Sequence, residues 1–315
     1  MTAKPPKNVP PKTPPPAFRS GFVSIIGRPN VGKSTLMNLF LGEKIAIVSN
    51  KPQTTRNRIT GILTGDGFQI VFLDTPGLHA PASKLGRFMM KSADSAMVGA
   101  DCLLFLTEPR GKMPDGDKIA LEKLVKTGAP VFLVINKIDL VEKSSLLGII
   151  AEYSRLYDFA EVIPISALKA ENTGLLLEMI RCVLPEGPMY FPGDMVTDQP
   201  ERQLAAELIR EKALRFLQEE VPHGVAVEIM SMKKRPGGEL VDVEATIYCE
   251  KDSHKGILIG RNGDMLKKIG SAARIDAERL LGSRIVLKLW VKVKKGWRDN
   301  DFLLRSFGYD AKSLE

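Results

Sequence analysis

Residues 27–34 read Gly-Arg-Pro-Asn-Val-Gly-Lys-Ser, and this octapeptide decides the fold. It fits the phosphate-loop pattern G-x-x-x-x-G-K-[ST] and lies between the apolar run Phe22–Ile26 and the helical periodicity of Ser34–Leu41. The glycines let consecutive backbone N–H groups surround a phosphate, and the helix N-terminus adds positive potential. The octapeptide therefore predicts a nucleotide phosphate site between a buried strand and a helix.

Two residues at the end of this loop have separate expected roles. Lys33 is expected to neutralise the β- and γ-phosphates, and the Ser34 hydroxyl is expected to bind Mg²⁺. Further expected nucleotide contacts from the same stretch are Gly27, Asn30, Gly32 and Thr35.

A second motif, Asp-Thr-Pro-Gly at 74–77, directly follows the apolar run Phe68–Leu73. The Asp74 carboxylate can hold Mg²⁺ through water, and the Gly77 N–H can face the γ-phosphate. The next residue is Leu78, where Ras-like proteins have the glutamine that orients water. Hydrolysis is therefore expected to be slow alone and assisted by another group or a partner.

A third motif, Asn-Lys-Ile-Asp at 136–139, follows another apolar strand candidate and indicates selection of guanine. The Asp139 carboxylate can accept from guanine N1–H and N2–H₂ together, whereas adenine would leave this charge unpaired. Asn136 is expected at the N7 edge and the stem of Lys137 over the base plane. Ser166-Ala167, after the last strand candidate, would place a backbone N–H near guanine O6.

These residues resemble the translation-factor-related class of GTPases, and the match covers residues 21–188. The resemblance implies a switch I segment at 51–56 (Lys-Pro-Gln-Thr-Thr-Arg), in which Thr54 or Thr55 closes over Mg²⁺ when GTP is bound. Together these motifs assign catalytic roles to Lys33, Thr55, Asp74 and Gly77. Asn30 adds a hypothesis, because related GTPases use an asparagine here to hold a K⁺ ion in place of an arginine finger.

The wider pattern predicts an α/β fold with a mostly parallel sheet covered on both faces, because short apolar runs alternate with helical stretches. The expected strands are Phe22–Ile26, Phe68–Leu73, Cys102–Thr107, Val131–Asn136 and Val162–Pro164. The expected helices are Ser34–Leu41, Lys84–Val98, Asp115–Thr127, Ser145–Tyr157 and Gly174–Val183.

The segments outside this domain have distinct compositions. Residues 1–20 hold seven prolines and no acidic residue, which predicts a disordered tail. Residues 189–200 are expected to be an interdomain linker. Residues 201–300 predict a small α+β domain of order α-β-β-α-α-β, and residues 301–315 a C-terminal tail. The elements expected in the α+β domain are a helix at Arg202–Glu220, strands at Val225–Met232 and Glu239–Glu250, a short helix before Gly260, a helix at Asp264–Leu281 and a strand at Arg284–Val293.

The second domain carries a candidate RNA site. Gly-Arg-Asn-Gly at 260–263 joins two expected helices, and G-x-x-G in this element order is the signature of a type II KH fold, which binds single-stranded nucleic acid. Residues 251–298 contain 13 Lys+Arg against 4 Asp+Glu, whereas residues 21–188 contain 19 against 17. The expected RNA contacts are Gly260, Arg261, Asn262, Gly263, Lys267 and Lys268.

One later stretch leaves two interpretations open. Residues 289–297 read Leu-Trp-Val-Lys-Val-Lys-Lys-Gly-Trp, which fits either an exposed strand face with Trp290 in the core or a surface that stacks on bases. The core placement of Trp290 is the preferred expectation. His223 and His254 are assigned no role.

Composition sets the class of protein. The formal net charge of +8 hints at an anionic partner. No apolar run approaches the ~20 residues of a transmembrane helix, and the N-terminus does not read as a signal peptide. Cys102, Cys182 and Cys249 match no metal or disulfide spacing, which favours a reducing cytosol and burial as small core residues.

A GTPase domain followed by one type II KH domain resembles the bacterial Era family over about residues 20–310. The stretches that carry the likeness are GRPNVGKST, KPQTTRNRI, DTPGLH, NKID, GRNG and LWVKVKKGW. The resemblance implies a GTPase that uses GTP, GDP and Mg²⁺ and binds near the 3′ end of 16S ribosomal RNA. It also implies a role in assembly of the small ribosomal subunit, and we expect a cytoplasmic monomer.

Two rival functions remain open from the sequence. The chain could be a signalling GTPase at the inner membrane surface, peripherally bound through its basic domain to anionic lipid. Alternatively, the KH unit could be a protein-interaction module for which RNA is incidental.

Overall fold

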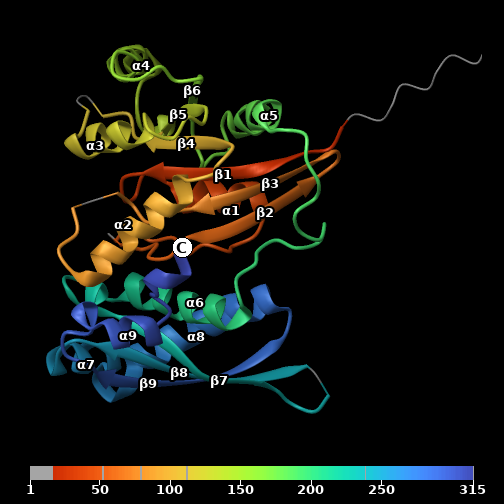
Figure 1. Ribbon diagram of the computed structural model, residues 1–315. Coiled ribbons are helices and arrows are strands. Elements are labelled where there is room, and N and C mark those ends of the chain that lie inside the picture. Colours follow the sequence, from red (N-terminus) through yellow and green to blue (C-terminus); the bar gives the residue numbers. More distant parts are fainter. Residues whose placement is uncertain (1–16, 52, 79, 111–112, 238, 315) are drawn as a thin grey trace, which may run out of the picture.

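The computed structural model describes residues 17–51, 53–78, 80–110, 113–237 and 239–314. Its first domain contains a six-stranded sheet of order β2-β3-β1-β4-β5-β6 (Figure 1). All neighbouring pairs are parallel except β2 and β3. The strands are β1 (Arg19–Gly27), β2 (Ile59–Gly65), β3 (Phe68–Asp74), β4 (Cys102–Thr107), β5 (Val131–Asn136) and β6 (Glu161–Ile165).

Helices cover both faces of this sheet, which confirms the predicted α/β class. The helices are α1 (Lys33–Leu41), α2 (Lys84–Met97), α3 (Asp115–Leu124), α4 (Leu146–Ser154) and α5 (Thr173–Val183). Apolar side chains of α1 and α5 pack on one face. Those of α2, α3 and α4 pack on the other. Because both faces are covered, β3, β4 and β5 are buried along their whole length.

The second domain has the predicted α-β-β-α-α-β order. Its elements are α6 (Glu201–Phe216), β7 (Ala226–Lys234), β8 (Leu240–Cys249), α7 (Asp252–Ile259), α8 (Asp264–Leu281) and β9 (Arg284–Val293). The sheet order is β7-β8-β9, antiparallel between β7 and β8 and parallel between β8 and β9. Helices α6 and α8 pack on one face of this sheet and share its core.

Several expectations at the ends of the domains need correction. Arg19 and Ser20, expected in the disordered tail, begin β1 because they pair with β3; residues 1–16 lie outside the described residues. The expected C-terminal tail contains α9 (Asp301–Ser306) and the 3₁₀ turn Ala311–Leu314, whose apolar residues pack with α2. The helix expected to reach Glu220 ends at Phe216, and a 3₁₀ turn follows at Val221–Gly224.

The expected linker is tied to the first domain. Ile62 N donates to Val196 O at 2.8 Å, and Thr197 Oγ1 donates to Thr60 O at 2.6 Å. The fully buried Gln69 accepts from Phe191 N at 3.0 Å. The segment therefore runs along β2 and β3 as a strap rather than a loose tether (Figure 1).

Two side chains, Cys182 and Trp290, differ from the expected burial. Cys182 is exposed, although Cys102 and Cys249 are buried as expected. Trp290 is 43% exposed, so its expected placement in the core is wrong. Among the described residues, every helix is too short or too polar to traverse a lipid bilayer.

Candidate nucleotide and RNA sites

The three nucleotide motifs meet in one cavity of about 290 Å³ at the carboxyl ends of the parallel strands. Gly32, with φ +102, lies so close to the third motif that a Cβ there would be 2.1 Å from Asn136 Nδ2. The phosphate loop therefore needs glycine at this position both for its backbone and for space. Thr35 and Asn30 also line the cavity.

Lys33 is folded back into its own loop. Its side chain is buried, and Nζ donates to Gly27 O at 3.0 Å and to Arg28 O at 2.8 Å. Burial lowers the Lys33 pKa to about 8, although the nearby Asp74 carboxylate opposes this shift. The two carbonyls thus hold the ammonium group at the loop, where the expected phosphates would satisfy it further.

Ser34, Thr55 and Asp74 form the hydroxyl–carboxylate cluster. Ser34 Oγ donates to Asp74 Oδ2 at 2.5 Å, and Thr55 Oγ1 lies 3.1 Å from Ser34 Oγ and 3.4 Å from Asp74 Oδ2. Thr54 points elsewhere, with its hydroxyl donating to Lys51 O at 2.6 Å. The structure therefore brings Thr55, and not Thr54, to the expected metal ligands.

This cluster fits a magnesium ion. Within the described residues, the buried Asp74 Oδ1 has no hydrogen-bond partner. Burial raises the Asp74 pKa to about 6, against the attraction of Lys33 and the Ser34 and Thr55 hydroxyls. A buried carboxylate with a free oxygen and two adjacent hydroxyls is a ligand set suited to this hard cation.

The residues after Asp74 are held against the phosphate loop. A Cβ on Gly77 would lie 2.5 Å from Pro29 N, so only glycine allows this approach. Leu78 N donates to Gly27 O at 3.1 Å, and the Leu78 side chain is buried in the core beneath. Leu78 therefore cannot orient water, as expected. His79 lies outside the described residues.

Asn136 is the hub of the base-recognition motifs. Its Nδ2 donates to Val31 O at 2.8 Å, and its Oδ1 accepts from Ala167 N at 2.9 Å. Asp139 Oδ1 accepts from Ser166 Oγ at 2.7 Å, and this hydrogen bond lowers the Asp139 pKa. The Ser166-Ala167 pair thus orients the other two motif side chains, in addition to its expected role near the base.

Sequence reasoning missed two carboxylates that support this site. Glu108 forms an ion pair with Lys137 Nζ, which also donates to Asn30 O at 2.7 Å. The fully buried Asp117 accepts from Arg28 Nε at 2.7 Å. Neither belongs to a motif; the position of Glu108 directly after β4, at the carboxyl edge of the sheet, was the available signal.

The KH loop has the geometry that its sequence predicted. Gly260 has φ +74, and a Cβ there would lie 2.8 Å from Met265 N. Gly263, with φ +83, leads into α8 and lines a groove of about 350 Å³ between α8 and β9. The groove residues that sequence reasoning missed are Leu266, Gly270, Ser271, Arg274, Leu287 and Leu289.

The structure places the expected RNA-contacting side chains in the loop or the groove, except for Lys268. Arg261 and Asn262 are exposed in the loop, and Lys267 lines the groove. Lys268 lies outside the groove, with Nζ 4.5 Å from the centre of the Phe216 ring of α6. Its geometry supports packing of α8 on α6 rather than a contact in the groove.

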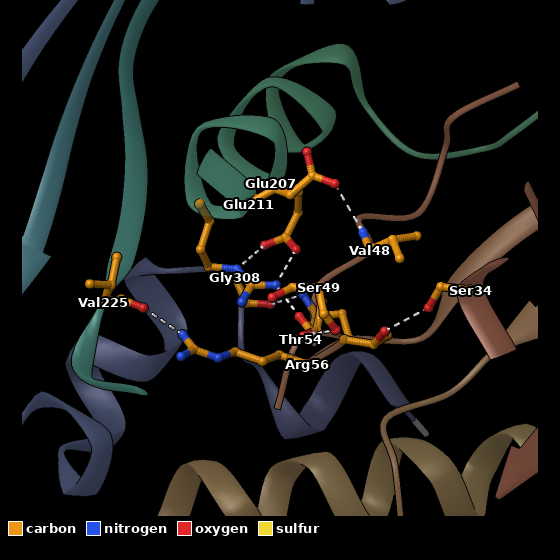
Figure 2. A network of polar contacts seen from close by, with 12 residues as sticks. Ser34, Val48, Ser49, Thr54, Arg56, Glu207, Glu211, Val225 and Gly308 are labelled. Carbon is orange, nitrogen blue, oxygen red and sulfur yellow. Dashed lines mark hydrogen bonds and ion pairs between the residues drawn. The ribbon is translucent and has the colours of Figure 1, made fainter. Parts of the chain in front are cut away.

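The switch I segment crosses directly into the KH domain (Figure 2). Arg56 is buried, with Nη1 donating to Val225 O at 2.7 Å and Nη2 to His223 O at 3.1 Å. Its guanidinium also lies 5.5 Å from the centre of the Trp297 ring. Two residues earlier, Thr54 O accepts from the buried Arg210 of α6. Pro52 lies outside the described residues.

A charge cluster continues this interface. Glu211 Oε1 accepts from Val48 N at 3.0 Å (Figure 2). Its Oε2 pairs with Lys44 and Lys212, each at 2.7 Å. Lys44 also pairs with Asp276 of α8 at 2.8 Å. Burial by itself would raise the Glu211 pKa, but the hydrogen bonds from the lysines outweigh it and lower the pKa.

The helix that follows the Asp-Thr-Pro-Gly motif also contacts the KH side. Leu85, Phe88 and Met89 of α2 pack with Tyr248 and with the C-terminal segment. The members from that segment are Trp297, Leu304 and Tyr309. Both segments that flank the nucleotide cavity are therefore in contact with the second domain.

Comparisons with known proteins agree with this architecture. A family model described as a 50S ribosome-binding GTPase matches residues 22–137, and a KH domain model matches residues 220–298. GTPase Era of Clostridioides difficile (strain 630) is 57% identical over 296 residues, which cover 94% of this chain and 100% of that protein. The chain belongs to the Era family of GTPases.

Further relatives extend the match to solved structures. GTPase Era of Clostridium kluyveri is 55% identical over 93% of this chain and 99% of that protein. A crystal structure of Era with MgGDPNP and nucleotides 1506–1542 of 16S ribosomal RNA has a TM-score of 0.89 and 40% identity. The match covers 93% of this chain and 99% of that Era chain. A single-residue variant of Aquifex aeolicus Era bound to GDP.AlF4⁻ matches with the same coverage, TM-score and identity. The Era architecture therefore spans both domains.

Proposed function

We propose that this chain is a GTP-binding and GTP-hydrolysing switch that binds 16S ribosomal RNA through its KH domain in small-subunit maturation. The observation that carries the proposal is the path of switch I. Thr55 joins the hydroxyl–carboxylate cluster of the nucleotide site, whereas the adjacent Arg56 is buried in the KH domain. The solved relative that holds MgGDPNP and a 16S fragment supports both ligands.

The residues divide the work of nucleotide binding. Lys33 and the loop N–H groups bind the phosphates, and Ser34, Thr55 and Asp74 would hold Mg²⁺. The ion, when bound, neutralises charge that develops on the phosphate oxygens. Because Leu78 is buried and apolar, no side chain at that position activates water. Slow intrinsic hydrolysis, raised by a partner, follows from this arrangement.

Guanine selectivity tests the nucleotide half of the proposal. Asp139→Asn should weaken GTP binding by about 10⁴-fold, because the amide cannot accept both guanine donors. It should strengthen binding of xanthosine triphosphate, whose C2 carbonyl can accept from the new amide. Asp158→Asn, at an exposed carboxylate outside the site, is the matched control. Unchanged GTP affinity in Asp139→Asn would contradict the assignment.

A K⁺ ion is proposed as an aid to hydrolysis at Asn30. The Asn30 backbone has φ 65, and its Nδ2 donates to Asn50 O at 2.8 Å, so it connects the phosphate loop to the residue directly before switch I. Turnover should be faster in KCl than in NaCl, and Asn30→Ala should remove the difference. Equal rates in the two salts would exclude this role.

The RNA half of the proposal is tested with the chain locked by a non-hydrolysable GTP analogue. Crosslinking to cellular RNA should enrich the 3′ end of 16S RNA, and Gly260→Asp should abolish the enrichment. Enrichment at no ribosomal site would refute it. Because the proposed partner is the ribosomal subunit, we place the protein in the cytoplasm. Peripheral membrane binding is a hypothesis that vesicle flotation tests, and a monomeric state is a hypothesis that light scattering tests.

A further inference from the structure

Strand β9 presents two chemically different faces. Its odd-numbered side chains Leu287, Leu289, Val291 and Val293 pack against the core beneath α6 and α8. The alternate positions 284, 288, 290, 292 and 294 are exposed. In Figure 1 the three strands lie on the side of α6 and α8 away from the GTPase sheet. The outer face of this sheet is therefore open along β9.

The exposed side chains of this face are one tryptophan and several basic residues around it. Trp290, 43% exposed, lies between Lys288 and Lys292, each two residues away and ~7 Å along the strand. Lys294 follows, and Arg284 lies at the start of the strand on the same side. We call this set the outer face: Arg284, Lys288, Trp290, Lys292 and Lys294.

The acidic residues of the neighbouring strand neutralise only part of this charge. Lys288 pairs with Glu244 at 3.5 Å, and Asp242 is paired with Arg235 at 2.6 Å. Across the described part of the chain, no ion pair involves Arg284, Lys292 or Lys294. The residue opposite Trp290 on β8 is Thr246, which carries no charge. Uncompensated positive charge therefore lies on the Lys292 and Lys294 side of the ring.

Trp290 differs in its contacts from the buried tryptophan of the chain. The other tryptophan of the chain, Trp297, is fully buried, its Nε1 donates to Gly224 O at 2.9 Å, and its ring contacts Phe307 edge-on. Trp290 has no such partners among the described residues, since no side-chain hydrogen bond or ring contact involves it. The exposed part of its ring, 43% of the residue's surface, is therefore available to a ligand.

We propose that the outer face binds a single-stranded RNA segment by stacking a base on Trp290, separately from the G-x-x-G groove. This inference rests on the proposed RNA-binding function. Aromatic rings on an open sheet, flanked by cations, bind unpaired bases without strict sequence preference. Lys292 and Lys294 would contact phosphates next to the stacked base. The strand that separates this face from the groove, β9, would then contact RNA on both sides.

A lipid surface fits this face less well. Membrane-surface binding needs a continuous apolar face. On the three strands, the only exposed large apolar side chains among the described residues are Trp290 and Met230. The charged, partly exposed Glu244 on β8 lies on this face between them. One isolated ring within a basic surface matches RNA better than a bilayer.

The test uses the full chain with a non-hydrolysable GTP analogue and an RNA of 16S nucleotides 1506–1542. Trp290→Ala should weaken binding about 5- to 100-fold, the range for loss of one base stack, and Trp290→Phe should restore most of it. Phe302→Ala, at an aromatic residue 72% exposed on α9, should have no effect. RNA should also quench the tryptophan fluorescence of the natural chain, and Trp290→Phe should remove this quenching, since Trp297 is buried.

The salt dependence gives an independent readout. Substituting Lys292 and Lys294 by Gln should reduce the slope of log affinity against log salt by about 1.4, at roughly 0.7 per phosphate contact. The same changes at Lys118 and Lys126, on or after α3, should leave the slope unchanged.

The outcomes separate this inference from the proposed function. Normal RNA affinity and quenching in Trp290→Ala would overturn the outer face and leave the KH assignment intact. No RNA binding by the unmodified chain would overturn both. Loss of binding to phosphatidylserine vesicles, with RNA affinity unchanged, would replace RNA by lipid as the occupant. A circular-dichroism melt of each variant confirms that it is folded.

Discussion

Replacing Arg56 by alanine should undock the two domains. The change removes hydrogen bonds to the buried Val225 O at 2.7 Å and the partly buried His223 O at 3.1 Å, together with the contact to the Trp297 ring at 5.5 Å. Leaving two acceptors unsatisfied costs about 1–3 kcal/mol each, and the lost ring contact about 0.5–2 kcal/mol.

The energy recovered when a buried charge is removed opposes these losses. No carboxylate pairs with Arg56 among the described residues, its Nε has no partner, and burial lowers its pKa. Desolvation of such an unpaired ion costs several kcal/mol. Taking the middle of each range, losses of about 5 kcal/mol and a recovery of about 3 kcal/mol leave a net weakening of docking of about 2 kcal/mol, or roughly 30-fold in the docking equilibrium.

Hydrogen exchange measures this shift directly. Amides of residues 221–227, at the contact with Arg56, should exchange faster in Arg56→Ala, while those of the buried strand β4 should not change. Arg58→Ala is the matched control. It removes the same charge two residues along the chain, and the Arg58 side chain makes no hydrogen bond or ion pair to described residues. Protection at 221–227 equal to that of the natural chain would refute the argument that Arg56 holds the domains together.

Three further predictions test the individual parts. Thr55→Ala should weaken Mg²⁺-dependent binding of a GTP analogue by at least tenfold with little effect on GDP, whereas Thr54→Ala should change neither, as fluorescent-nucleotide titration will show. Gly260→Ala should lower RNA affinity at least tenfold, because its Cβ would lie 2.8 Å from the first turn of α8 at φ +74; Gly256→Ala, within α7 and in open space, should not. Because the Glu211 pKa is lowered in the fold, its contribution to stability is present above the unfolded value near 4.5 and is lost as pH falls through the folded pKa. Thermal melts between pH 3 and 7 should therefore show a smaller acid loss in Glu211→Gln, and identical pH profiles would contradict this role.

Local motifs made the nucleotide site predictable. Lys33, Asp74 and Asn136 each lie within a few residues of a strand end, so a short pattern fixes both their chemistry and their place at one edge of the sheet. The choice between Thr54 and Thr55 was not predictable, because adjacent residues of a loop differ only in the direction that tertiary contacts give them.

The missed features depend on distant partners. Strand β2 escaped detection because Gly61 and Gly65 interrupt its apolar pattern; a Cβ at Gly61 would lie 2.7 Å from a Leu41 side-chain carbon of α1, which would have to shift. Trp290 was expected in the core, yet the period-two alternation of β9 places it on the face of Lys288, Lys292 and Lys294, while α6 and α8 cover the opposite face. The ion pair of Glu108 with Lys137 joins residues 29 positions apart without a pattern.

The geometry of switch I makes nucleotide state and domain docking a single equilibrium. Three consecutive residues alternate between partners: Thr54 O is bonded to the KH domain, Thr55 Oγ1 to the metal-site hydroxyl, and the Arg56 guanidinium again to the KH domain. Because Thr55 lies between two residues that are each bonded to the KH domain, a shift of Thr55 should disturb the contacts of both neighbours. Linkage is reciprocal, so an RNA that favours one arrangement of the domains must change the relative affinity for GTP and GDP by the same factor by which the nucleotide changes RNA affinity.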